Sequence, residues 1–228
     1  SSTGASWAEV FLQDSRTAHV ERTPGGAEAR EGADRGAAFT VEAGGRNFFR
    51  AVEGLNPGLL RAQAMELARA AGGGAARSVP RLEARPPRLV STGRPGPEPP
   101  LPIKESVVRE AWEAACAEAG VREACVLLKD SSSRVAVANS DGLLTSEVQD
   151  SLTLYVQVQV ADGPRSAEAS SVISTSGGAG RMEGDAHKRL AAEAVESARF
   201  GLRAGPVPQG ELPVVLSPFA AGQLLHEG

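Results

Sequence analysis

A stretch rich in proline and arginine, residues 75–102, limits the folds open to this chain more than any other feature. It holds eight of the fifteen prolines, five arginines and only two acidic residues. Proline lacks a backbone N–H and favours extended conformations, so a segment of this composition does not build a hydrophobic core. We expect an extended linker or surface strap, in which residues 81–85 could pair as an edge strand. The chain then divides into a first domain at 1–74, the linker at 75–102 and a second domain at 103–228.

The first domain is predicted to be a meander of strands with one helix laid on it. The Ala-Gly-Gly sequence at 43–45 has the chemistry of a hairpin turn. Asn56 and Pro57 are a helix start signal and the glycines at 72–74 an end signal, so a helix is expected over 59–71. Strands are expected at 9–14, 17–23, 35–42 and 46–52.

The second domain contains the clearest strand signal in the sequence, the alternation LTLYVQVQV that begins at Leu152. Apolar residues at helical spacing predict helices over 104–119 and 185–203. Strands are expected at 124–129, 134–139, 152–161 and 167–175. The chain as a whole is therefore predicted to have an α+β fold, with two units of mainly antiparallel sheet, each with packed helices, joined by the linker.

The composition excludes several classes of protein. Hydrophobic residues make up 41% of the chain and charged residues 23%, as in globular proteins generally. The net charge is −4 and no basic stripe carries interleaved aromatic residues, which argues against direct binding of nucleic acid. No apolar run reaches about 18 residues, so no membrane span is expected. Cys116 and Cys125 lack C-x-x-C spacing, and we expect a reducing, cytoplasmic location.

The last sixteen residues, PVVLSPFAAGQLLHEG, carry the strongest chemical signal. The apolar run at 213–216 suits a buried strand, and Ser217 followed by Pro218 is a helix start. The helix expected over 219–227 ends in His226 and Glu227. A His followed directly by Glu on a helix is half of a zinc-hydrolase signature, in which the imidazole binds the metal and the carboxylate is general base for water. Taken alone, such a pair is more often simply the end of a helix.

Four segments of the chain share their pattern with one known family. They are the run VVLSPFAAGQLLHE before Gly228, the turn NSDG at 139–142, the run GPVPQG at 205–210 and the opening ASWAEV from Ala5. These segments resemble, in order, the entry to the metal site, a hairpin, the approach to the final strand and the opening strand of the TldD/PmbA family, whose members carry the name modulator of DNA gyrase. The resemblance covers most of the chain, which would be the N-terminal half of a TldD-like member.

The resemblance implies a zinc metallopeptidase that acts on short or unstructured peptides. His226 would be a zinc ligand and Glu227 the general base, because TldD-like members carry this pair and PmbA-like partners generally lack it. In the family, a second His five residues after the first and a Cys near the far C-terminus complete the zinc site. No residue of this chain corresponds to either, so this truncated chain is expected to be inactive by itself.

The expected partners are a peptide substrate and a second subunit, in a homodimer or a heterodimer with a PmbA-like subunit, without direct contact to nucleic acid or membrane. The alternative is a non-catalytic PmbA-like partner or scaffold module that mediates subunit association. Direct modulation of DNA gyrase is a third and weaker hypothesis.

The remaining reactive residues are assigned structural roles. His19 is expected on the solvent face of a strand and His187 on the surface of a helix. Cys116 and Cys125 are expected to be small buried hydrophobic residues. The polar turn at 139–142 is interpreted as a hairpin turn and the glycine-rich run at 176–180 as a loop, because the latter lacks the Lys-Ser/Thr pair of a phosphate-binding loop.

Overall fold

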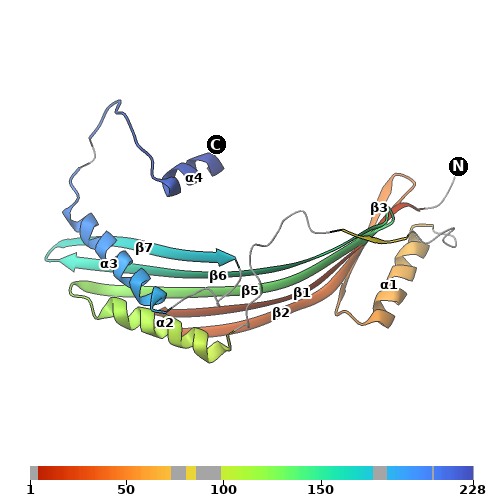
Figure 1. The fold of residues 1–228 in the computed structure, drawn as a ribbon, viewed down its shortest axis with the longest axis horizontal. Helices are drawn as coiled ribbons and strands as arrows, with labels where there is room; N and C mark the ends of the chain where they lie inside the picture. The colour runs from red at the N-terminus through yellow and green to blue at the C-terminus, as the bar shows by residue number, and fades with distance from the viewer. Residues whose placement is uncertain (1–4, 73–80, 86–98, 177–183, 207, 228) are drawn as a thin grey trace.

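The computed structural model describes residues 5–72, 81–85, 99–176, 184–206 and 208–227. In this part of the chain, seven strands form one open sheet and four helices accompany it (Figure 1). The strands are β1 (Ala5–Thr23), β2 (Gly26–Ala43), β3 (Arg46–Glu53), β4 (Glu83–Ala84), β5 (Val121–Asn139), β6 (Leu143–Asp162) and β7 (Arg165–Ser176). The helices are α1 (Pro57–Ala70), α2 (Leu101–Cys116), α3 (Ala186–Arg203) and α4 (Pro218–Glu227).

The long strands run side by side in the order β3-β2-β1-β5-β6, with β7 and the short β4 both paired to β6. β1 pairs antiparallel with β5 from Glu9–Asn139 to Arg22–Val126, so strands of both predicted domains form one continuous sheet. The predicted α+β fold with a mainly antiparallel sheet is confirmed. β4 pairs parallel with the start of β6, so the edge strand expected within residues 81–85 is present. The domain boundaries remain a prediction.

Tight turns connect neighbouring strands. Between β2 and β3, Gly44 and Gly45 have φ angles of 57° and 73°. These positive angles are those of the two-residue hairpin turn whose twist matches the flanking strands. The hairpin expected from the Ala-Gly-Gly sequence is therefore confirmed.

A polar band crosses the middle of the sheet. Residues 14–17 of β1 pair with 32–35 of β2 on one side and with 131–134 of β5 on the other. Arg35 donates to Asp14 across this band at 2.6 Å. The sequence pattern predicts both β1 and β5 as two shorter strands with breaks here, whereas each is one strand of 19 residues. That prediction is wrong because the alternation of polar and apolar residues disappears where no described helix covers the sheet (Figure 1).

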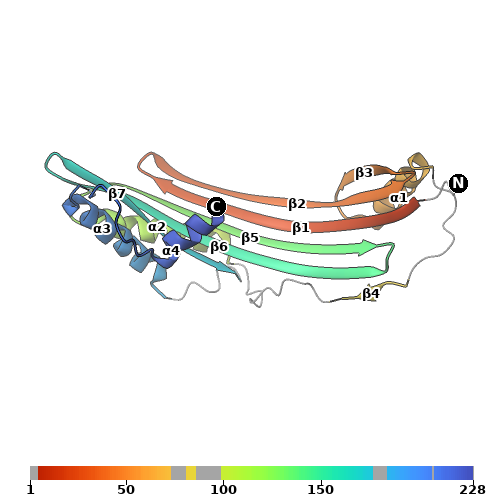
Figure 2. The same ribbon diagram turned by 90° about the horizontal axis from the view of Figure 1, so that it is seen from above.

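The larger core lies under α2 and α3 at one end of the sheet (Figure 2). Val126, Leu154 and Val156 of the sheet have no exposed surface. The helices contribute the apolar stripes expected from their sequence, including Ala111 and Ala194, both also without exposed surface. Buried residues of β6 alternate with half-buried ones, as expected of a strand with one face under helices.

The smaller core lies under α1 at the other end of the sheet. Its buried members are Ala37, Phe39 and Leu67, which are 5–8% exposed. The side chain of Asn56 caps α1 by accepting from the backbone N–H groups of Gly58 and Leu59, as its sequence predicts. The β1 residues that pack in the two cores all have even numbers, and β1 has no bulge between Trp7 and Thr23. Successive side chains of a strand point to opposite faces, so both cores lie on the same face of the sheet.

Candidate metal centre

The last helix, α4, begins as its sequence predicts. The Ser217 Oγ accepts from the backbone N–H of Ala220 at 3.2 Å, and Pro218 is the first helical residue. The backbone N–H of Ala221 donates to the Ser217 carbonyl at 2.8 Å. Ser217 thus accepts from two of the backbone N–H groups in the first turn of α4. Pro218 has no backbone N–H, so it leaves no donor without a partner there.

The segment that leads into α4 differs from the prediction. Residues 213–216 form no strand and are exposed, with Val215 98% exposed and Val214 73%. The expectation of a buried strand is wrong because apolar character alone does not pair a strand, and no described strand offers it a partner. In Figure 1, α4 stands clear of the sheet.

His226 and Glu227 lie at the exposed end of α4. The amide nitrogen of Gln223, one turn earlier, donates to the Glu227 carboxylate at 3.1 Å. The residue types suit a metal ligand and a general base, but among the described residues no group of three or more His, Cys, Asp or Glu side chains is placed to hold a metal ion. A catalytic zinc site usually has three protein ligands. The described residues therefore provide at most a part of such a centre, and the roles of His226 and Glu227 remain a prediction.

The other two histidines lie elsewhere in the fold. His19 is on β1 with its Nε2 3.9 Å from the Glu21 carboxylate and a side chain 41% exposed, close to the expected solvent-facing position. His187 is only 7% exposed, so its expected surface position is wrong. Its Nε2 lies 3.3 Å from Glu110 on α2. The sequence gives no sign of this contact, because 77 residues separate the two partners.

Glu110 is the centre of a polar cluster that joins α2 to α3. Its carboxylate accepts from the Ser106 hydroxyl at 2.9 Å and lies 3.2 Å from the ammonium of Lys188. The Ser106 hydrogen bond, followed by those of Lys188 and His187, lowers the pKa of Glu110 to about 2. The cluster thus holds a charged carboxylate between two helices of the larger core.

The cysteines show no sign of reactivity. Cys116 is exposed at the end of α2, so the expectation that it is buried is wrong, while Cys125 is half-buried. Burial of the sulfur atoms nevertheless raises the pKa of both thiols. A raised pKa lowers the fraction of thiolate, the form that binds metals and acts as nucleophile.

The turn at residues 139–142 is structural, as predicted. The Asn139 side-chain oxygen accepts from the backbone N–H groups of Asp141 and Leu143, both at 3.1 Å. Gly142 has a φ of 88°, and its carbonyl accepts from the N–H of Glu83 on the short edge strand. Most of the glycine-rich run at 176–180 lies outside the described residues.

The sequence of the central part of the chain matches a known family. Residues 94–199 match the family model of the PmbA/TldA metallopeptidase central domain. This central part of the chain is therefore similar to the central domain of the TldD/PmbA family. The matched residues contain α2, strands β5 to β7 and most of α3, which together carry most of the larger core.

Solved structures share the fold over most of this chain. A candidate modulator of a DNA gyrase from Thermotoga maritima has a TM-score of 0.71 at 13% identity, over 90% of this chain and 46% of its own. One from Bacteroides thetaiotaomicron has a TM-score of 0.71 at 17% identity, over 98% of this chain and 52% of its own. TldE from Thermococcus kodakarensis has a TM-score of 0.59 at 13% identity, over 85% of this chain and 44% of its own. The chain therefore spans about half the length of these proteins.

No curated protein matches the sequence. None of the described helices has both the length and the apolar character that crossing a membrane requires.

Proposed function

We propose that this chain is part of a TldD-like zinc metallopeptidase that cleaves short or unstructured peptides. The match of residues 94–199 to the metallopeptidase central domain carries the proposal. The position of His226 and Glu227 at the end of α4 supports it, because a His-Glu pair on a helix has the residue types of a zinc ligand and its neighbouring base.

In this proposal the two residues have different roles. The imidazole of His226 would bind zinc, and the Glu227 carboxylate would take a proton from the attacking water. Gln223 would hold the Glu227 carboxylate through the hydrogen bond already present in α4. Zinc would supply Lewis-acid polarisation of the scissile carbonyl. The remaining ligands would come from outside the described residues.

Two substitutions in the complete protein test these roles. Glu227→Gln is expected to abolish peptide cleavage, a loss on the order of 10²–10⁴ or more in rate, and to leave zinc bound. His226→Ala is expected to lose both zinc and activity, because it removes a ligand. Zinc content by atomic absorption and cleavage of an unstructured peptide measure the two effects. His19→Ala, on β1, is the control and should change neither.

Near-normal cleavage by the Glu227→Gln protein would contradict the proposal. The pair would then be only the end of a helix, and the non-catalytic role as a PmbA-like partner or scaffold module would replace the enzymatic one. Peptidase activity without any dependence on zinc would contradict the metal assignment alone.

The 228-residue chain by itself is expected to bind zinc weakly, because one imidazole falls short of the usual three ligands. Calorimetric titration with zinc measures this. Tight one-to-one binding that disappears in His226→Ala would show that this chain contains a complete site.

A further inference from the structure

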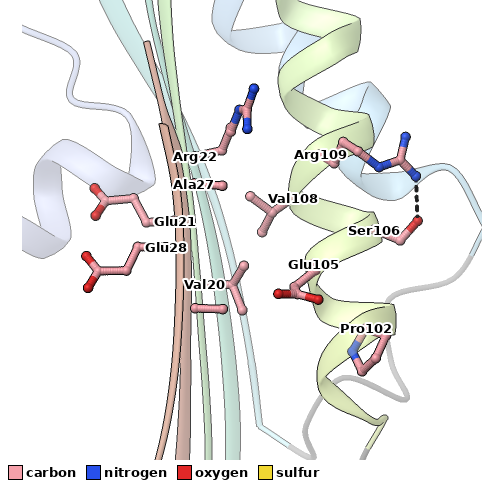
Figure 3. A pocket seen from close by; sticks show the side chains of 11 residues that line it. Val20, Glu21, Arg22, Ala27, Glu28, Pro102, Glu105, Ser106, Val108 and Arg109 are labelled. Carbon is pink, nitrogen blue, oxygen red and sulfur yellow. Dashed lines mark hydrogen bonds between the residues drawn. The ribbon is translucent and has the colours of Figure 1, made fainter. Parts of the chain in front are cut away.

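A pocket of about 410 Å³ lies between α2 and the β1–β2 hairpin (Figure 3). Val20 of the sheet and Val108 of the helix lie at its base and are only 3% and 2% exposed, whereas Ala27 and Pro102 beside them are exposed. Glu21 and Glu28 also border the pocket, but their side chains point away from α2 on the other face of the sheet (Figure 3). The charged side chains on the pocket's own side are therefore those of α2 and of Arg22.

Arg22 presents its guanidinium at one end of this pocket. The guanidinium carbon lies 4.7 Å from the centroid of the Trp112 ring. Trp112 is held in place because its Nε1 donates to the carbonyl of Ala124 at 3.0 Å. A guanidinium stacked on a fixed aromatic ring keeps its planar donors in one orientation.

No acceptor among the described residues bonds to Arg22, and its Nε is buried without a partner. The buried Nε is closed to a ligand from solvent, but the two terminal nitrogens of the guanidinium can donate side by side to a carboxylate. Arg109, the nearest other arginine in the pocket, is already engaged, since it donates to Ser106 at 2.9 Å and to Glu113 at 3.2 Å. Arg22 is thus the cation with bonding capacity left for a ligand.

Glu105 supplies the opposite charge at the other end of the pocket (Figure 3). It precedes Trp112 by seven residues on α2, a separation of about 10.5 Å along the helix axis at 1.5 Å per residue. An extended peptide advances about 3.3–3.6 Å per residue, so the charged ends of two or three residues match this separation.

We propose that this pocket binds a short peptide of two or three small aliphatic residues. The C-terminal carboxylate lies against Arg22, the N-terminal ammonium faces Glu105, and the small side chains contact the exposed Ala27 and Pro102. The site uses neither His226 nor Glu227, so its test is independent of the test of the proposed peptidase activity.

Calorimetric titration of the 228-residue chain with trialanine tests the proposal, with fluorescence of Trp112 in a Trp7→Phe chain as a second signal. Saturable binding is expected. A trialanine amide on the wild-type chain, or trialanine on Arg22→Gln, should bind about ten- to a hundredfold more weakly, because each removes one charge-assisted contact. N-acetyl-trialanine and Glu105→Gln should weaken binding about three- to tenfold, since Glu105 is more exposed to water.

The matched control is Arg30→Gln, because Arg30 lies on the same hairpin but on the opposite face and pairs with Glu28 at 2.6 Å. It should bind trialanine like the wild type. If Arg22→Gln does not fold, the amide peptide tests the same contact on the unchanged protein. The absence of saturable trialanine binding at millimolar concentration, or equal affinity for trialanine and its amide, would overturn the proposal.

Discussion

The two ends of the sheet are covered by helices in different ways. Under α2 and α3 many residues lose all contact with solvent, including Val126, Leu154 and Ala194. Under α1 the buried set is Ala37, Phe39 and Leu67, and each keeps a few per cent of its surface exposed. The stabilising free energy of burial grows with the apolar area removed from water. The end under α2 and α3 is therefore the strong end of the sheet, and the end under α1 is the weak end.

The polar band between the two cores explains how they can differ in one sheet. Across residues 14–17 and their partners the strands are held by their backbone ladder and by contacts such as the Arg35–Asp14 ion pair, not by a hydrophobic layer. The apolar layers at the two ends are therefore separate. Disturbing one end should leave the other end's side-chain packing intact, and the following predictions test this difference.

The largest effect is expected from the buried ion pair of the strong end. The Nζ of Lys104 on α2 lies 2.9 Å from the Asp130 carboxylate on β5, with side chains only 1% and 6% exposed. Lys104→Met leaves a buried carboxylate without its cation and should lower the free energy of unfolding by about 3–5 kcal/mol. Urea denaturation followed by circular dichroism measures the loss.

Two further variants control this experiment. Lys104→Met combined with Asp130→Leu should recover much of the loss, because a well-packed apolar pair can replace a buried ion pair. Arg30→Met, in an exposed ion pair with Glu28, should change stability little. A Lys104→Met protein as stable as the wild type would show that the pair adds nothing to the strong end.

The second prediction compares the same substitution at both ends. Leu154→Ala removes a side chain with no exposed surface and should cost close to the upper part of the 2–5 kcal/mol range for such changes. Leu67→Ala, under α1 and 5% exposed, should fall near the lower part, because the smaller core can relax around the gap. Equal losses in urea denaturation would contradict the division into a strong and a weak end.

A smaller effect is expected at the start of α1. Asn56→Ala removes the oxygen that accepts from Gly58 and Leu59 and should cost about 1 kcal/mol. Amide hydrogen exchange should show faster exchange in α1 with unchanged protection in β6. Asn56→Asp keeps the acceptor and should behave like the wild type. Faster exchange throughout the sheet would mean that the two ends unfold as one unit.

The smallest effect concerns acid stability at the α2–α3 contact. The hydrogen bond from Ser106 and the contacts with Lys188 and His187 lower the pKa of Glu110 from 4.5 to about 2. A lowered carboxyl pKa stabilises the folded state above about pH 4.5, and this contribution is lost as the pH falls toward 2. The stability difference between wild type and Glu110→Gln should therefore shrink over this interval. A difference independent of pH would assign the contribution of Glu110 to packing.

Several features of the fold and the site follow from local sequence. Asn56 and Ser217 cap α1 and α4 as predicted, since a capping side chain bonds to backbone within three residues of itself. The alternation from Leu152 and the helical stripes of α2 and α3 likewise determine which face of each element is buried. The family resemblance and the structural role of Asn139 were also accessible from sequence.

Other features required the tertiary structure, because they depend on residues far apart in the chain. The pairing of β1 with β5, the contact of His187 with Glu110, the exposure of Cys116 and the stacking of Arg22 on Trp112 join or separate elements that no local pattern relates. The exposed position of residues 213–216 has the same origin, since an apolar run is buried only where another element meets it. Sequence by itself determined the helices and the apolar faces of the elements, whereas only the tertiary structure decided how far β1 and β5 extend, that residues 213–216 pair with no described strand, and which of those faces meet.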